Sequence, residues 1–167
     1  IVAVPLFSFS HCEELDQARY LLGIREKPSK AFLDSPHSRY PASSLKRVRT
    51  KLPLAMTDAM DDDPISAEAV ASGIRPNVRS QDSVSLILVG LNTKDSSDSK
   101  RQLKILESVA ETVKKSLGLK NAKAAMLCSG SDRKTKENCE RALQEGCRRL
   151  SREGRVIVAA HSLIEGE

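Results

Sequence analysis

The chain of 167 residues contains no tryptophan, and phenylalanine and tyrosine together make up only 3% of it. Proteins that bind single-stranded nucleic acid stack its bases on aromatic side chains, so this composition argues against nucleic acid as a partner. No apolar stretch approaches the length of about eighteen residues that marks a membrane-spanning helix, so we expect no membrane partner. The opening IVAVPLFSF lacks the basic lead-in of a signal peptide. Because there is no initiator methionine, we expect a processed chain or part of a longer protein.

The cysteines lack the spacing that is typical of metal sites. None of the four cysteines stands in a C-x-x-C pair, which argues against a zinc or iron–sulfur centre. Two of them fall on the apolar face of a predicted helix. The sequence therefore predicts buried thiols in a reducing compartment, which is the cytoplasm or the stroma or matrix of an organelle. The four residues are Cys12, Cys128, Cys139 and Cys147.

Charge and length set only broad bounds. Twenty-seven basic and 22 acidic residues give a net charge of +5, which favours an anionic partner without separating nucleic acid from a small polycarboxylate. The basic clusters Lys46–Lys51, Arg133–Lys136 and Arg148–Arg155 are dispersed, and both solvated faces and an anion-binding surface remain open for them. The length suits one domain, or one domain and part of a second.

The clearest pattern is a strand, a polar loop and a helix. Val84–Gly90 (VSLILVG) is a short apolar run closed by glycine, which is typical of a strand buried on both faces. The loop Leu91–Ser99 follows, and Ser99 with Gln102 forms a capping box. Apolar residues then recur at helical spacing until Gly118. They are Leu103, Leu106, Val109, Ala110, Val113 and Leu117.

The same unit is repeated downstream. Ala122–Cys128 predicts a strand, Thr135–Ser151 an amphipathic helix that ends near Gly154, and Arg155–Ala160 a last strand. Strands that alternate with helices at this spacing predict an α/β fold, a three-layer sandwich with a mainly parallel sheet. Ligands of such sheets bind beyond the carboxyl ends of the strands.

The first half looks like the end of an earlier copy of this unit. Ile1–Phe7 predicts a buried strand, and a capping box of Ser10 and Glu13 predicts a helix that ends at Gly23, with His11 at its first position. Residues 24–45 are rich in proline, serine and lysine, which indicates a long loop insertion.

A short strand and a helix complete this first half. Val48–Ala55 fits a short strand, with Pro53 favouring an edge position. Asp63 as N-cap and Pro64 at the first helical position predict a helix that ends at Gly73. Arg75–Ser83 is then a linker.

A faint internal repeat supports this division. IVAVPLFSFSH and VIVAAHSLIEG can be overlaid with Ser8 on Ser162, and Glu165 then stands where His11 stands. We therefore expect residues 1–80 to complete one α/β unit and residues 81–167 to begin the next.

Three stretches together resemble one enzyme family. VSLILVGLNTKDSSDSKRQ, LPLAMTDAMDDDPISAEAVASGI and IVAVPLFSFSH resemble, in their order, segments of the small, tandem-repeat (CbiX-type) sirohydrochlorin and cobalt chelatases. That resemblance implies a pair of α/β units with a tetrapyrrole cleft between them. It also implies insertion of a divalent metal (cobalt, iron or nickel) by a lyase that needs no ATP or other cofactor, with histidines that bind the metal and take the pyrrole protons.

The resemblance carries over only in part. His11 matches the family's second histidine, whereas Leu91 stands where the first is expected. Asn92 and Thr93 keep polar character there, and Asp95 matches the family aspartate. From the resemblance and the chemistry of the neighbouring side chains together, we predict a catalytic His11 and Glu13, a metal held by His11 and Glu14, and a substrate bound by Ser8, Ser10, Asn92 and Thr93.

Each of these residues also has a simpler interpretation. Glu13 fits a capping role, Glu14 a solvated one, and His11 an ordinary surface position. His161, at the end of the last strand, is a secondary site candidate to which the family gives no role, and His37 lies in the insertion. Other minor candidates are Asp61–Asp63 for a hydrated metal ion and the loop SGSDRK for an anion.

Two hypotheses for function follow. The first is a tetrapyrrole chelatase that inserts cobalt or iron into sirohydrochlorin or a related precursor, whose carboxylates suit the positive net charge. The alternative is an inactive chelatase-like domain that serves as a structural or binding subunit of a homodimer or larger assembly. The absence of a histidine at Leu91 and the 24–45 insertion favour the alternative. A nucleic-acid-associated protein rests on charge alone.

Overall fold

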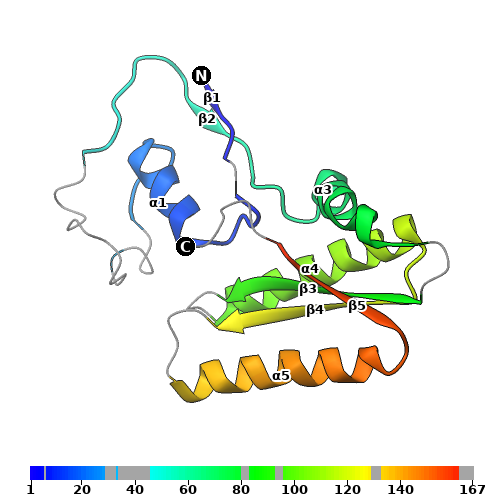
Figure 1. Ribbon diagram of the computed structural model, residues 1–167. Coiled ribbons are helices and arrows are strands. Elements are labelled where there is room, and N and C mark those ends of the chain that lie inside the picture. Colours follow the sequence, from blue (N-terminus) through cyan, green and yellow to red (C-terminus); the bar gives the residue numbers. More distant parts are fainter. Residues whose placement is uncertain are drawn as a thin grey trace. The chain divides into compact units, whose positions relative to one another are not determined.

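The computed structural model describes residues 1–5, 7–28, 33, 46–79, 83–92, 96–128 and 133–161. The chain forms two compact units, Ile1–Ala59 (unit 1) and Met60–Glu167 (unit 2). Both units contain helices and parallel strands (Figure 1), so the predicted α/β class with a mainly parallel sheet is confirmed. Not one of the described helices combines the length and the apolar content that crossing a bilayer requires.

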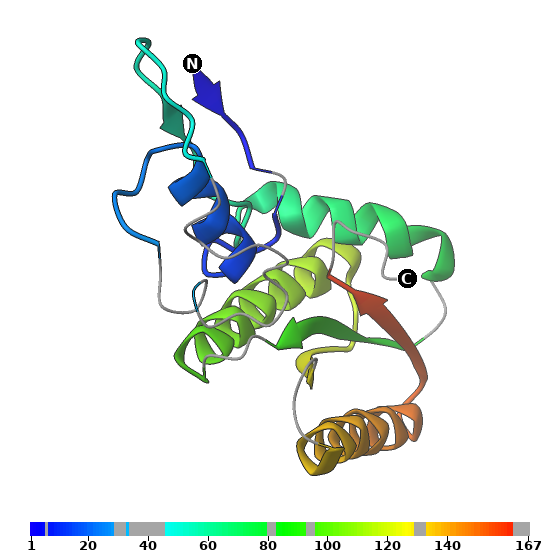
Figure 2. The ribbon, with the colours of Figure 1, turned by 90° about the vertical axis from the view of Figure 1, so that its left-hand side faces the viewer.

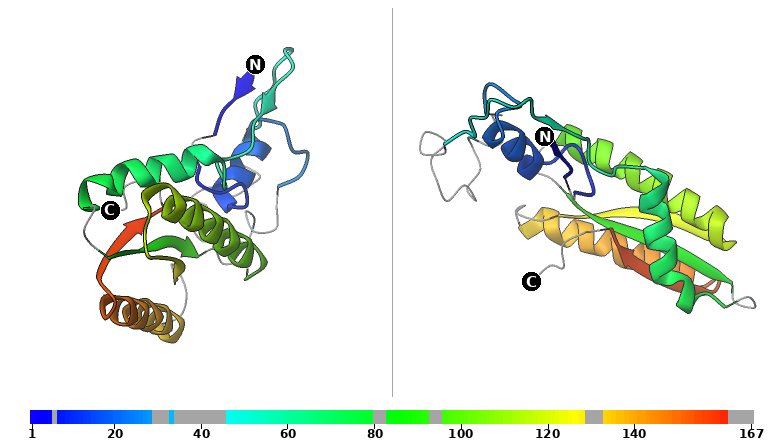
Figure 3. Two further views of the ribbon diagram at one scale, coloured as in Figure 1. Left: turned by 90° about the vertical axis from the view of Figure 1, so that its right-hand side faces the viewer. Right: turned by 90° about the horizontal axis from the view of Figure 1, so that it is seen from above.

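Unit 2 is a three-layer sandwich. Its sheet has the order β4-β3-β5, and all strand pairs are parallel. Helix α4 covers one face and α5 covers the other (Figure 3), while α3 packs beside α4 (Figure 2). In chain order the elements are α3 (Pro64–Ile74), the 3₁₀ helix η2 (Arg75–Asn77), β3 (Val84–Asn92), α4 (Ser96–Leu117), β4 (Asn121–Cys128), α5 (Arg133–Ser151) and β5 (Arg155–Ala160).

The central strand β3 organises the core of unit 2. Every residue from Val84 to Gly90 is buried, as the continuous apolar run predicts for a strand covered on both faces. Ile87 and Val89 pack against Leu150 of α5. On the other face Gly90 approaches α4, because a Cβ atom built on it would lie 2.6 Å from Cδ1 of Leu106. The alternation of a β-strand thus distributes neighbouring residues between the two helix layers.

Most element ends in unit 2 follow the sequence signals. Asp63 caps α3, since its side chain accepts a hydrogen bond from the backbone N–H of Ile65 at 2.9 Å. Gly118 ends α4 with a φ of +64°, a conformation that favours glycine. The predicted strands 122–128 and 155–160 and the predicted helix 135–151 are confirmed within two residues at each end.

Two predictions in unit 2, the start of one helix and a linker, are wrong. Helix α4 begins at Ser96, so Ser99 lies inside its first turn and does not cap it. Helix α3 ends at Ile74, within one residue of the predicted stop at Gly73, but the linker predicted for Arg75–Ser83 begins with the 3₁₀ helix η2. Capping motifs and glycines are local signals, and packing of the neighbouring turn overrides them.

Unit 1 departs further from the predictions. Its elements are β1 (Val2–Ala3), α1 (Glu13–Leu21) and β2 (Ala55–Met56), and β1 pairs with β2 in parallel. The buried strand predicted for Ile1–Phe7 is wrong, because only two residues pair and Val2 and Val4 are exposed. The strand predicted for Val48–Ala55 is likewise limited to the pair at Ala55–Met56.

The start of α1 also differs from the prediction. Cys12, in extended backbone, is the N-cap and makes no side-chain cap hydrogen bond. The capping box of Ser10 and Glu13 is therefore wrong, and His11 precedes the helix instead of opening it. Ser10 has another role, since its Oγ accepts a hydrogen bond from the backbone N–H of Ala59 at 3.0 Å. Gly23 ends the segment as predicted, with a φ of +77°.

The unit boundaries of the structure and of the resemblance describe different things. The compact units meet between Ala59 and Met60, so α3 belongs with the sheet of unit 2. The predicted units 1–80 and 81–167 rest on the internal repeat and the order of the expected elements, and they stay predictions. Most of the predicted insertion 24–45 lies outside the described residues.

Candidate functional site

The carboxyl edge of the β4-β3-β5 sheet is the natural place for a ligand in unit 2. The chain leaves β3 through α4 to reach β4 on one side, and leaves β4 through α5 to reach β5 on the other. Helices α4 and α5 lie on opposite faces (Figure 1). The space beyond β3 and β5 is therefore the topological switch point, where open parallel sheets bind ligands.

His161 lies at this switch point. It directly follows β5, and its backbone N–H donates a hydrogen bond to the carbonyl of Val89 in β3 at 2.8 Å. The residue is only 7% exposed. Burial lowers the pKa of its imidazole below the usual value, because desolvation disfavours the charged form. At neutral pH His161 is thus a neutral imidazole, the form that binds a divalent metal ion or accepts a proton.

The end of β3 presents a different chemistry. Leu91 is 56% exposed, at the position where the resemblance expects a histidine. Asn92 is the last residue of the strand, at the predicted edge. Thr93 and Asp95 lie outside the described residues, so their predicted roles stay predictions.

The end of β4 corrects the prediction for cysteine. A disulfide joins Cys128, the buried last residue of β4, to Cys139 in the second turn of α5. The prediction of a free thiol at these two positions is therefore wrong. Sequence spacing alone missed the pair because strand, loop and helix have to fold back before the residues meet. Cys147 is not in a disulfide and packs against the core of unit 2, and Cys12 is the other free cysteine.

The predicted metal and catalytic residues of unit 1 lie around the start of α1. His11 and Glu14 are exposed, Ser8 is half-buried, and Glu13 is the first helical residue. Burial raises the pKa of the neighbouring Cys12 thiol to about 11, so it stays protonated at neutral pH. His11, Glu13 and Glu14 are thus neighbours in the sequence. Their joint role in a metal site stays a prediction.

The minor candidates have plain outcomes where the structure describes them. Asp63 is the N-cap of α3, which is the simpler of its two interpretations. Within the described part of the chain, no three histidine, cysteine or acidic residues are grouped so as to hold a metal ion. His37, residues 129–132 of the SGSDRK loop and Glu165 lie outside the described residues.

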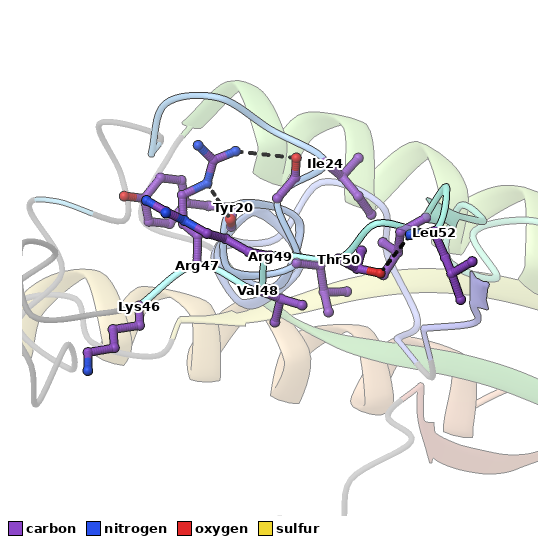
Figure 4. A pocket seen from close by; sticks show the side chains of 11 residues that line it. Tyr20, Ile24, Lys46, Arg47, Val48, Arg49, Thr50 and Leu52 are labelled. Carbon is purple, nitrogen blue, oxygen red and sulfur yellow. Dashed lines mark hydrogen bonds between the residues drawn. The ribbon is translucent and has the colours of Figure 1, made fainter.

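Sequence reasoning missed a cavity in unit 1. The cavity measures about 940 Å³ and lies between the end of α1 and the extended segment 46–54 (Figure 4). The basic run KRVRTK, which forms much of the cavity wall, was visible in the sequence. The sequence did not show that this run lies against the end of α1.

Comparison with known proteins adds no relative. No protein-family model matches the chain, and no curated protein or solved structure matches it either. The resemblance to chelatases therefore stays a prediction.

Proposed function

We propose that this chain is a chelatase-like protein that inserts a divalent metal, cobalt or iron, into sirohydrochlorin or a related anionic tetrapyrrole. The observation that carries the proposal is the buried histidine at the switch point of a parallel sheet. His161 lies at the carboxyl edge, beside the strand whose sequence resembles the opening of the chelatases.

The chemistry of metal insertion suits such a residue. An incoming divalent ion replaces two pyrrole protons, so the site needs a neutral group that binds the ion or accepts a proton. The lowered pKa of His161 keeps its imidazole in that form at neutral pH. We assign His161 this role in unit 2, and His11 remains the candidate in unit 1. Asn92, at the end of the adjacent strand, is the proposed substrate contact on the same edge.

A second candidate function has its own support. Leu91 exposes an apolar side chain at the carboxyl edge, in the place where the resemblance expects a metal-binding histidine. Such an edge suits a domain that holds a tetrapyrrole or a protein partner without catalysing insertion. In that case the chain is a binding or structural subunit of a homodimer or a larger assembly.

Metal insertion separates the two functions. Sirohydrochlorin and cobalt(II) are incubated with the chain, and the absorbance change is followed beside a protein-free control. Each of the three histidines is replaced by glutamine in turn, and circular dichroism checks that each variant folds. His37→Gln is the matched control, since no role is proposed for it.

The outcomes are distinct. Insertion above the uncatalysed rate that His161→Gln abolishes supports the proposal and its site. Insertion that only His11→Gln abolishes keeps the enzyme and moves the site to unit 1. No insertion, together with saturable binding of sirohydrochlorin in the absence of metal, favours the binding subunit and rejects the enzyme.

A further inference from the structure

The cavity of unit 1 has a wall of unusual composition. Its volume of about 940 Å³ is at the upper end of small-molecule sites, which span roughly 300–1,000 Å³. Three cationic residues line it, together with Tyr20 and Thr50. Among the described residues that line the cavity, none is acidic. Its apolar wall is formed by Leu22, Ile24, Val48, Leu52 and Leu54.

One of the three cations, Arg47, has a structural role. The guanidinium of Arg47 donates hydrogen bonds to the carbonyl groups of Tyr20, Gly23 and Arg25, at 3.4, 3.3 and 2.8 Å. It also lies 5.4 Å from the centre of the Tyr20 ring. Figure 4 shows how Arg47 thereby fastens the extended segment to the end of α1. The helix dipole also favours a cation at the carboxyl end of α1. Because these contacts connect the two segments that form the cavity, Arg47 determines its shape.

The other two cations remain available to a ligand. Lys46 and Arg49 are exposed, and neither forms an ion pair with another described residue. Arg49 carries a planar guanidinium that suits two-pronged hydrogen bonding to a carboxylate. Thr50 adds a hydroxyl donor beside it, since its oxygen already accepts a hydrogen bond from the backbone N–H of Leu52 at 3.0 Å.

From these observations we infer that the cavity binds an organic carboxylate with a broad apolar body. Arg49 and Lys46 attract the carboxylates, and the apolar side chains, Ile24 among them, contact the body. Positive charge alone would attract any anion, whereas the apolar wall selects one with an apolar surface to bury. The inference extends the proposed function, because an anionic tetrapyrrole belongs to this class of ligand. It rests on that function only for the choice of macrocycle.

Equilibrium binding without metal tests the inference. The full chain is titrated into uroporphyrin, an octacarboxylate, and the porphyrin fluorescence is followed. The matched ligand is a tetracationic N-methylpyridyl porphyrin, which has a similar ring and the opposite charge. The matched variants are Arg49→Gln, which lines the cavity, and Lys51→Gln, which lies in the same segment and does not line it. Ile24→Ser tests the apolar wall.

We expect uroporphyrin to bind and the cationic porphyrin not to bind. Arg49→Gln should weaken binding about fivefold, as the loss of one partly exposed ion pair predicts, and Ile24→Ser should weaken it as well. Lys51→Gln should stay within about twofold of the parent chain, since Lys51 is not among the residues that line the cavity. Equal losses for Arg49→Gln and Lys51→Gln would show attraction by net charge alone and would overturn the inference. Absence of binding would overturn it too, and because no metal is present, that result is independent of the insertion assay.

Discussion

The disulfide of unit 2 leads to a quantitative prediction about its stability. Cys128 and Cys139 are separated by 11 residues in sequence. In the chain-entropy model, closing a loop of this length in the unfolded state stabilises the fold by about 2.8 kcal/mol at 25 °C. That is a substantial part of the roughly 5–15 kcal/mol of a typical domain. Reduction of this bond should therefore lower the free energy of unfolding of unit 2 by about this amount.

Urea denaturation with and without a phosphine reductant measures the effect. The chain has no tryptophan, so far-ultraviolet circular dichroism is the probe, and α4 and α5, the two longest of the described helices, report on unit 2. With a denaturant dependence of about 2 kcal/mol per M, the midpoint should fall by about 1.4 M on reduction. Cys147→Ser retains the bond and should respond to the reductant as the parent does. The double variant Cys128→Ala/Cys139→Ala should not respond to it.

Two results would refute this reasoning. Identical denaturation curves with and without reductant would mean that the bond contributes nothing to stability. A mass spectrum of the untreated protein with all cysteines open to alkylation would mean that the bond does not form where the protein was made. The second result would agree with the reducing compartment predicted from the sequence, which stays a prediction.

Three further predictions concern unit 2. The fold lowers the pKa of His161, so the unfolded chain binds the imidazole proton more tightly than the folded chain does. The free energy of unfolding should therefore be highest at neutral pH and fall by at most about 1.4 kcal/mol per pH unit as the pH drops through the titration range of histidine. His161→Gln should flatten this part of a pH series of urea midpoints. Gly90→Ala should destabilise by about 1–3 kcal/mol, because its Cβ would lie 2.6 Å from Cδ1 of the buried Leu106, and a double-mutant cycle with Leu106→Ala should show a smaller combined loss than the sum. Gly73→Ala should stabilise by about 0.4–1 kcal/mol, since the added methyl meets nothing within 4 Å in the last turn of α3 and the substitution restricts the unfolded chain; a lower thermal midpoint would contradict this.

The sequence predicted unit 2 better than unit 1, and the reason is physical. Strand β3 is buried on both faces, so a central position in the sheet is the stable environment for its apolar run. The apolar stripe of α4 is likewise buried, because the helix packs that side against the sheet. In unit 1, the apolar run at the start of the chain pairs over two residues only, and Val4 stays exposed. Apolarity predicts a strand only where enough neighbouring strands exist to bury it.

The site was harder to predict than the fold. The loop after β3 was expected at the sheet edge, and β3 does end there at Asn92. The burial of His161 was not visible, because it depends on the ladder hydrogen bond to Val89, which lies in a strand more than sixty residues earlier. The cavity of unit 1 was equally hidden, since Arg47 joins it to carbonyl groups at the end of α1 by contacts that no local pattern encodes.

The position of His161 also bears on the absence of a histidine at position 91. A family motif assigns a residue to one place along one strand, so the leucine at position 91 counts as a missing histidine. In a parallel sheet, however, the carboxyl ends of neighbouring strands face the same space. His161, which directly follows β5, therefore lies on the edge that a β3 residue would serve, and its backbone N–H is bonded to the carbonyl of Val89 in β3. If the protein is a chelatase, replacing Leu91 by histidine should add a second ligand to a functioning site; if it is a binding subunit, the same change should leave insertion absent.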